Sequence, residues 1–317
     1  MAIILDTDIG GEPDDALALA VAAGLPELSL VITSDEHNGR RAKMARQILD
    51  LLMRSDVPVV AGRDLGRTEN WAAEGIVPPG VPDQPTDVLT AVDALLGRTP
   101  EPVMWVGTGP MSNLADVLTA FPTAAQRLVV TQVGGSLAWY TDRPEPTIEA
   151  DLPAARAVLS ARTLLRLLPV ETTMHLLNAI DRDAVEYDII ARADDPVSTM
   201  LRKHMEVWFD HHRSSIDQSA LLALALAVDP RLFTVTPSSI GLDPVGRLQS
   251  GEHSVLMVDT FEHLTFRAWS VPLVAGIKDL PDRAIPSLLP IRAQTAREMI
   301  EVYQPEPHSA ASEQGEQ

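Results

Sequence analysis

Four aspartates crowd one short segment near the start of the chain, where Asp6, Asp8, Asp14 and Asp15 flank a Gly-Gly turn. Apolar residues of strand length lead into the turn, and a helical pattern follows it. Carboxylates held close together repel one another unless shared protons or a cation compensate their charge. A hard divalent cation with oxygen ligands would do so. The segment therefore predicts a metal site at a strand-to-helix turn.

Helix capping explains only part of this acidity. Pro13 suits the first position of a helix, and acidic side chains in a first turn interact favourably with the helix dipole. Asp14 or Glu12 could therefore cap the helix that follows. Capping does not account for Asp6 and Asp8, so the metal hypothesis stands beside it.

The composition limits which metal and which partners to expect. The chain has 317 residues, 45% of them hydrophobic, and no cysteine. Without thiolates, a metal would have oxygen and imidazole ligands, which makes calcium or magnesium a better candidate than zinc. The formal charge of −19 argues against nucleic acid as a partner, because binding the phosphate backbone requires a basic face. A small-molecule substrate is the better expectation.

Apolar runs of strand length alternate with segments of helical spacing in the first half of the chain. The predicted strands are Ile3–Leu5, Leu28–Thr33, Val57–Ala61, Val103–Gly107, Leu128–Val133 and Leu165–Thr172. The predicted helices are Ala16–Ala23, Arg41–Met53, Thr86–Leu96, Ser112–Ala120 and Pro153–Leu164. This alternation is typical of an α/β fold with an open, mostly parallel sheet flanked by helices. Ligands of such sheets bind at the carboxyl ends of the strands.

The second half of the chain is expected to add helices and a small antiparallel portion. Helical spacing covers Val197–His212 and Ser219–Val228, and strand patterns follow at Ser254–Val258 and Thr265–Val271. We expect one domain over residues 1–305 and a disordered polar tail over 306–317. Neither a membrane span nor a signal peptide is evident, so a cytoplasmic protein is expected.

Other polar clusters follow later strands of this predicted sheet. They comprise residues 34–38, residues 107–113, and Gly134-Gly135 together with Glu145 and Thr147. Each cluster taken alone is more typical of a turn than of a binding site. Because the carboxyl ends of parallel strands share one edge of a sheet, their joint placement indicates one shared pocket.

Taken together, these residues resemble the calcium-dependent nucleoside hydrolases, also called inosine-uridine preferring nucleoside hydrolases. The resemblance runs from residue 3 to about residue 300. Six ordered motifs carry it: the Asp-x-Asp, Gly, Asp-Asp-Ala pattern of residues 6–16, Asn38 ahead of Arg46, Thr108-Gly-Pro-Met-Ser-Asn113, Val133-Gly-Gly, Glu145-Pro-Thr ahead of Asp151, and Asp217 ahead of residues 225–233.

The resemblance implies a Ca²⁺ site held by Asp8, Asp15, the carbonyl of Thr108, and Asp217. Such a set suits calcium, which accepts carboxylate, carbonyl and water oxygens. Asp8 would also be the general base that takes a proton from the water attacking the anomeric carbon of an N-glycoside. Asp6 is expected to brace the loop.

The same resemblance implies a set of substrate contacts. Asp14, Asn38, Glu145 and Glu171 would bind the ribose hydroxyls. Thr147 and Glu171 stand where asparagine or aspartate is commoner, which changes the hydrogen bonding near the 5′ side of the sugar. Family members are commonly dimers or tetramers, so a homodimer or homotetramer is expected.

Three departures from the family pattern concern the metal loop and the base. Asp8 and Asp14 are six residues apart, two more than in the common form, and Glu12 lies in the added length. We expect Glu12 to be a helix-end carboxylate, with an added metal ligand or a sugar contact as alternatives. Ile216 and Trp71 stand where many members carry histidines, and an aliphatic side chain cannot donate a proton to a leaving base.

Aromatic stacking could replace part of this lost acid function. Trp71 and Trp139 lie on loops expected near the base, where a stacked purine can become basic enough to take a proton from solvent. The other candidate acids are the histidines of the second half, His175, His204, His211 and His212.

The chemistry expected overall is hydrolysis of a ribonucleoside to free base and ribose, with purines slightly favoured and a role in nucleoside salvage. Alternatives are a hydrolase of a modified nucleoside or nucleotide, a non-catalytic ribose-binding protein, and a phosphohydrolase of the haloacid dehalogenase type. The last would need a lysine after a later strand, and none is convincing.

Overall fold

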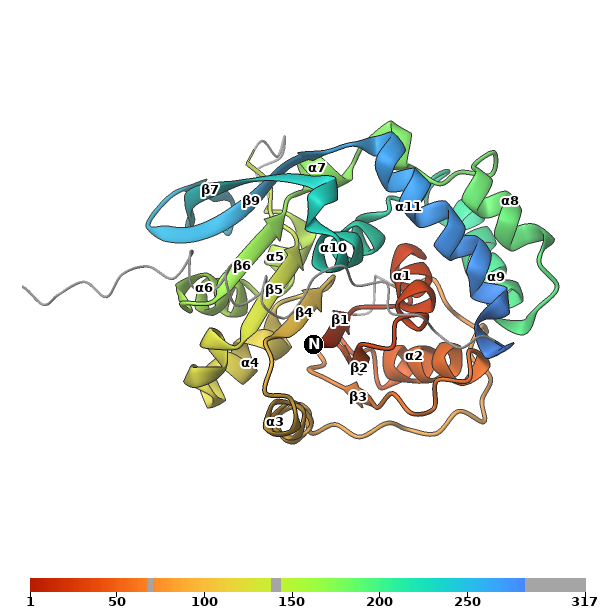
Figure 1. Cartoon of the computed structure of the whole chain (residues 1–317), viewed down its shortest axis with the longest axis horizontal. Coiled ribbons are helices and arrows are strands. Elements are labelled where there is room, and N and C mark those ends of the chain that lie inside the picture. Colours follow the sequence, from red (N-terminus) through yellow and green to blue (C-terminus); the bar gives the residue numbers. More distant parts are fainter. Residues whose placement is uncertain (68–70, 138–143, 283–317) are drawn as a thin grey trace, which may run out of the picture.

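The computed structural model describes residues 1–67, 71–137 and 144–282 (Figure 1). The described chain forms one sheet of nine strands in the order β3-β2-β1-β4-β5-β6-β9-β7-β8. The strands are β1 Ala2–Thr7, β2 Leu28–Thr33, β3 Val59–Ala61, β4 Val103–Gly107, β5 Leu128–Val133, β6 Leu164–Leu168, β7 Phe233–Leu242, β8 Leu248–Ser250 and β9 His253–Phe261. Neighbouring strands from β3 through β9 are parallel, whereas β7 pairs antiparallel with both β9 and β8. The predicted α/β class and its antiparallel portion are confirmed.

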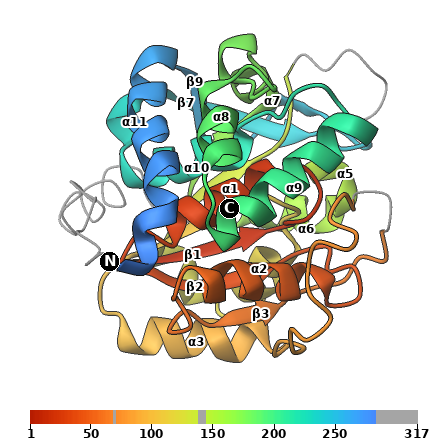
Figure 2. The same ribbon diagram turned by 90° about the vertical axis from the view of Figure 1, so that its right-hand side faces the viewer.

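Helices cover both faces of this sheet (Figures 1 and 2). They are α1 Asp14–Ala22, α2 Arg40–Leu51, α3 Val88–Arg98, α4 Ser112–Ala120, α5 Pro146–Ala150, α6 Leu152–Ser160, α7 Val170–Thr173, α8 Val185–Arg192, α9 Pro196–His211, α10 Ser219–Val228 and α11 His263–Gly276. Alternate residues of β1 point to opposite faces, as strand geometry requires. Ile3 and Leu5 pack against α1, α2 and α10, while Ala2 and Ile4 pack with α3, α4 and α6.

Two segments of the second half differ from the sequence-based expectation. Residues 265–271 were expected as a strand but belong to α11, because Phe266, Ser270 and Val274 are buried at helical spacing. The predicted strand Leu165–Thr172 ends at Leu168, since Pro169 has no N–H to continue the ladder, and α7 begins at Val170. The strand β7 was not predicted, and Pro237 interrupts its pattern.

The sheet order creates a crevice at the carboxyl ends of β1 and β4. After β1 the chain moves outward through β2 and β3, then returns to add β4 on the other side. In open α/β sheets, ligands bind at such a reversal of strand order. Asp6 pairs in register with Gly107, so the segments that follow these two residues leave the sheet side by side.

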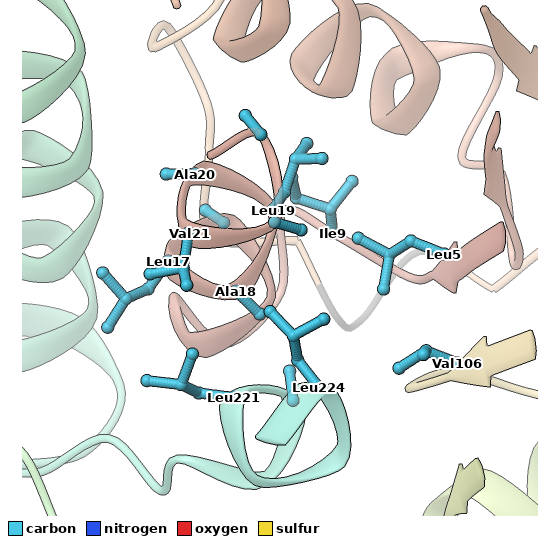
Figure 3. Close-up of a cluster of buried hydrophobic side chains, with 14 of the residues drawn as sticks. Leu5, Ile9, Leu17, Ala18, Leu19, Ala20, Val21, Val106, Leu221 and Leu224 are labelled. Atoms are coloured by element: carbon cyan, nitrogen blue, oxygen red, sulfur yellow. The ribbon is translucent and has the colours of Figure 1, made fainter. Parts of the chain in front are cut away.

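Helix α10 is the buried centre of one face. Every residue from Ala220 to Val228 is buried, and the helix packs against α1, β4 and β5. Figure 3 shows Leu221 and Leu224 of α10 facing Leu17 and Ala18 of α1. The position of α10 therefore depends on apolar packing along its whole length. No helix in the described ranges has the length and apolarity needed to cross a membrane. The tail predicted over 306–317 lies outside the described residues.

We predict that Leu224→Ala lowers the free energy of unfolding by about 2–5 kcal/mol, because it opens a cavity between α10 and α1. Leu264→Ala is the matched control, since Leu264 of α11 is 82% exposed whereas Leu224 is 0% exposed. The control should change the free energy by less than about 0.5 kcal/mol. Urea unfolding followed by circular dichroism measures both, and equal losses would contradict the packing described for α10.

Candidate functional site

A pocket of about 300 Å³ opens at the carboxyl ends of the central strands. The loops after β1, β4 and β5 contribute Asp8, Thr108 and Gly134 to its wall. Further lining comes from four later parts of the chain: residues 71–72, residues 145–147, residues 170–174, and the segment from Trp208 to Ser219. The pocket thus gathers the segments that the strand-end argument placed together.

The aspartates after β1 divide into two groups. Asp8, Asp14 and Asp15 line the pocket, as does Glu12. Asp6 is buried behind them, where its Oδ1 accepts a hydrogen bond of 2.9 Å from Asn113 Nδ2. Burial raises the pKa of Asp6 to about 8. A position behind the loop agrees with the bracing role expected for Asp6.

The pocket carboxylates have raised pKa values because they are buried close to one another. Burial, with repulsion from Asp15, raises the pKa of Asp8 to about 7. Burial and the same kind of repulsion raise the pKa of Asp14 well above its ordinary value. For Asp15, burial raises the pKa, and hydrogen bonds from the hydroxyls of Thr108, at 2.5 Å, and Thr7 oppose the shift.

A buried arginine provides positive charge beneath this cluster. The Arg41 guanidinium is 1% exposed and donates to the carbonyl oxygens of Asp8 and Ile9, the latter at 2.9 Å. Its Nε donates to the carbonyl of Asp35 at 2.6 Å. The Arg41 charge partly offsets the rise in pKa at Asp8 and Asp15. Nothing in the sequence predicts this role, because an arginine that becomes buried has the same pattern as any other arginine at the start of a helix.

The lengthened part of the loop is anchored at successive carbonyls. Ala72 N donates to Gly10 O at 2.7 Å, and His204 Nε2 lies 3.0 Å from Gly11 O. A carbonyl only accepts, so His204 carries its proton on Nε2. Burial lowers the pKa of His204 to about 4, which keeps the ring neutral. The added residues are therefore a braced element of the site.

Gly10 also meets Trp71 at close range. The backbone of Gly10 has φ +101°, and a Cβ built there would lie 2.4 Å from Trp71 Cζ3. Trp71 lines the pocket, and its Nε1 donates to Glu74 at 3.2 Å. The ring of Trp71 thus packs against the backbone of the aspartate loop at the pocket wall.

Glu12 joins the loop to the far end of the site. Its Oε1 accepts a hydrogen bond of 2.6 Å from the backbone N–H of Asp217, and burial raises its pKa to about 8. Helix α1 begins at Asp14 without a side-chain cap, so Glu12 does not cap α1 but lies at the N-terminal end of α10 instead. Asp14 likewise reaches α10, accepting from Ala220 N at 2.9 Å. Two loop carboxylates therefore hold the N-terminal end of α10 and position Asp217.

The expected substrate residues fall partly inside the pocket. Glu145 and Thr147 line it, and Glu145 caps α5 by accepting from Thr147 N at 2.9 Å. Asn38 and Glu171 are exposed and are not among the lining residues. Asn38 has a left-handed backbone, with its N–H 3.1 Å from Asp64 Oδ2, and Glu171 accepts from the hydroxyl of Ser136. Val170, Thr173 and Met174 from the same segment line the pocket instead.

Aromatic side chains form another part of the wall. Trp208 and His212 both line the pocket, with their rings stacked at 4.8 Å and an interplanar angle of 15°. Trp208 was not singled out in the sequence, although its four-residue spacing from His212 on a helix was visible. Ile216 is buried and pairs with the backbone of Ile180, away from the lining. Trp139 lies outside the described residues.

The donor chemistry of the pocket fits a hard cation. Asp8, Asp15, Thr108 and Asp217 all line it, and the Arg41 charge only partly offsets the rise in pKa that burial causes at Asp8 and Asp15. In the described ranges, however, no three histidine or acidic side chains converge as a ready-made metal cluster. The oxygen set suits calcium, whose coordination number and geometry are permissive.

Comparison with known proteins identifies the family. The sequence model of the inosine-uridine preferring nucleoside hydrolases matches residues 3–271. The chain belongs to this family. It is therefore an N-glycosyl hydrolase acting on ribonucleosides, and the resemblance stated from the motifs is confirmed. Enzymes of this family are typically metal-dependent.

Named nucleoside hydrolases are similar along most of this chain. The pyrimidine-specific ribonucleoside hydrolase RihA of Enterobacter sp. (strain 638) is 29% identical, covering 79% of this chain and 86% of its own. The non-specific ribonucleoside hydrolase RihC of Shigella boydii is 30% identical with the same coverage. The structure of the purine-preferring ribonucleoside hydrolase from Gardnerella vaginalis has a TM-score of 0.74 at 19% identity, covering 88% of this chain and all of that one, so it shares the fold.

We predict that Glu12→Ala lowers the free energy of unfolding by about 1–3 kcal/mol, because the Asp217 N–H loses its buried acceptor. Glu12→Gln keeps an acceptor oxygen and should lose much less. Urea unfolding measures the stability, and hydrogen exchange at the Asp217 amide measures the local effect. Equal exchange rates in the wild type and the alanine variant would contradict the described bond.

The raised pKa values also predict how the metal-free protein responds to pH. Asp6, Asp8 and Glu12 hold protons in the folded state that the unfolded chain has released, up to pH values of about 7 or 8. Their contribution to stability is therefore full below the unfolded pKa of about 4 and is lost as the pH rises toward 8. With a chelator present, the free energy of unfolding should fall between pH 5 and pH 8.

Asp6→Asn provides the control for this pH dependence. The amide oxygen still accepts from Asn113, but the titrating proton is gone, so the slope of unfolding free energy against pH should be shallower. Chemical denaturation at a series of pH values tests it, and identical slopes in the two proteins would refute the assignment to Asp6.

Proposed function

We propose that this enzyme hydrolyses the N-glycosidic bond of ribonucleosides with Asp8 as the general base and calcium as its cofactor, and that it prefers purine nucleosides. The observation that carries the proposal is one pocket that combines Asp8, Asp14 and Asp15 with Glu145 and an aromatic wall. A ribose needs polar partners for its hydroxyls and a base needs a flat apolar surface. This pocket offers both.

The calcium site would be held by Asp8, Asp15, the carbonyl of Thr108, and Asp217. Calcium bound there would lower the pKa of a bound water and orient it. The protein contributes the placement of the ligands. Thr7 and Thr108 hold the Asp15 carboxylate by their hydroxyls, and Glu12 holds the backbone of Asp217.

Asp8 is suited to the base role by its position and its surroundings. It lies at the start of the loop, fixed through its own carbonyl by Arg41, and its carboxylate faces the pocket. A base whose pKa lies near neutrality is efficient at taking a proton in the transition state, and the pKa of Asp8 in the metal-free protein is about 7. The buried carboxylates also stabilise the positive charge that develops on the sugar ring.

Asp14, Glu145 and Thr147 are the lining residues we assign to the ribose. Asp14 and Glu145 are buried acceptors at two sides of the pocket, each fixed by a backbone amide. Sugar hydroxyls can donate to their remaining lone pairs. Asn38 and Glu171 are exposed, so only the family resemblance supports a role for them in binding the ribose.

The preference for purines is supported by the aromatic lining. Trp71 and the stacked pair of Trp208 and His212 give the pocket extended flat surfaces. Larger bases gain more from stacking on such surfaces. The names of similar enzymes include pyrimidine-specific, non-specific and purine-preferring hydrolases, so the preference of this chain depends on its own lining.

We predict that the protein releases free ribose from nucleosides, faster from inosine, adenosine or guanosine than from uridine or cytidine. A chelator should abolish release and added calcium should restore it. Asp8→Asn should lower kcat by about 10²–10⁴-fold, because it removes the general base without changing its shape. A reducing-sugar assay measures the rates for the whole panel.

Asp83→Asn is the matched control, since Asp83 is exposed, pairs with Lys43 and is not among the lining residues of the pocket. It should leave kcat unchanged. Full activity of Asp8→Asn would remove the assigned base, and release that survives the chelator would remove the metal. Faster turnover of pyrimidine nucleosides would reverse the proposed preference.

A further inference from the structure

Breaking an N-glycosidic bond leaves an electron pair on the departing base nitrogen. Unless a proton reaches the base as the bond breaks, the base must leave as an anion, which is a poor leaving group. The residue expected to supply this proton in many family members is replaced here by Ile216, whose side chain is buried away from the pocket. The proton therefore needs another source, given the function proposed above.

His212 is the lining residue best suited to supply it. Among the described residues that line the pocket, it has the single imidazole. Arg213 also lines the pocket, but a guanidinium does not release its proton in proteins. Glu12 and Asp14 accept backbone hydrogen bonds from the N-terminal end of α10. Histidine is the usual proton donor near neutral pH.

The ring of His212 is held in a defined orientation. Its backbone N–H donates to Trp208 O at 2.9 Å at the end of α9, which brings the two rings together. Trp208 is fixed in turn, because its Nε1 donates to Ser215 O at 2.9 Å. The two rings form a platform on the pocket wall, in which His212 is the exposed residue. A base stacked near this platform would have a ring N–H beside it.

We propose that His212 protonates the leaving base. In this step, the oxygen of the attacking water bonds to the anomeric carbon and its proton goes to Asp8. The C–N bond breaks, its electron pair goes to the base nitrogen, and the base takes a proton from His212. The products are ribose and neutral base. His212 then recovers a proton from solvent and Asp8 releases one, so water is the only reactant consumed.

A comparison of two leaving groups tests the proposal. The wild type and His212→Gln are assayed on inosine and on 4-nitrophenyl riboside, whose nitrophenolate leaves without needing a proton. His212→Gln should lower kcat on inosine by about 10²–10⁴-fold. It should leave kcat on the nitrophenyl riboside nearly unchanged, which loss of structure would not do.

Two further variants keep the result interpretable. His211→Gln changes the neighbouring exposed histidine, which does not line the pocket among the described residues, and should retain full activity on both substrates. Glu12→Gln removes the other protonated candidate while keeping its hydrogen bond to Asp217. If Glu12→Gln shows the leaving-group-dependent loss and His212→Gln does not, His212 is not the donor.

The remaining outcomes are distinct. Equal slowing of both substrates by His212→Gln would assign His212 to binding or structure and overturn the proposal. No slowing of either would do the same. If the wild type hydrolyses neither substrate, the proposed function itself fails, whatever the role of His212.

Discussion

Electrostatic repulsion among carboxylates at the end of β1 would spread the aspartate loop apart if the loop were free. Asp14 and Asp15 are buried and Asp8 is partly buried at one pocket, and Asp6 lies just behind them. Hydrogen bonds from threonine hydroxyls, backbone amides and Asn113, together with the Arg41 charge, oppose this repulsion. Each of these donors comes from a different element, so the loop also ties those elements together.

The family resemblance implies a loop two residues longer than the common form, and the structure shows what holds residues 10–12 in place. The carbonyls of Gly10 and Gly11 are bound by Ala72 and His204, and Glu12 reaches the Asp217 amide. The extra residues therefore connect β1 to α9 and α10, which lie about two hundred residues later in the chain. The position of Asp217 therefore depends directly on the conformation of the aspartate loop.

Much of the fold could be predicted because the buried parallel strands are continuous apolar runs and the helices between them have regular spacing. Residues 265–271 show where this kind of prediction fails. A short apolar stretch fits the periodicity of a strand as well as that of a helix, and the burial of Phe266 and Val274 on one face identifies the helix. Within the site, Asp8, Asp15 and Thr108 could be located because they follow strands.

Other site residues could not be located in this way, since their roles depend on packing between distant segments. Arg41 and His204 support the site only because the folded loop places backbone carbonyl oxygens within hydrogen-bonding distance of them. Asn38 matches a family motif in order along the chain, yet its left-handed turn leaves it exposed. A motif preserves sequence spacing, whereas the direction of a side chain depends on the local backbone.

The contact between Gly10 and Trp71 has an evolutionary consequence. Any side chain at position 10 would collide with the indole, and the backbone there favours glycine in any case. A change of Trp71 to a smaller residue would relieve the collision but remove part of the pocket wall. The aspartate loop and this part of the pocket wall cannot then change independently of each other. Loss of the tryptophan in a relative would remove the steric constraint on position 10, whereas the positive φ would still favour glycine there.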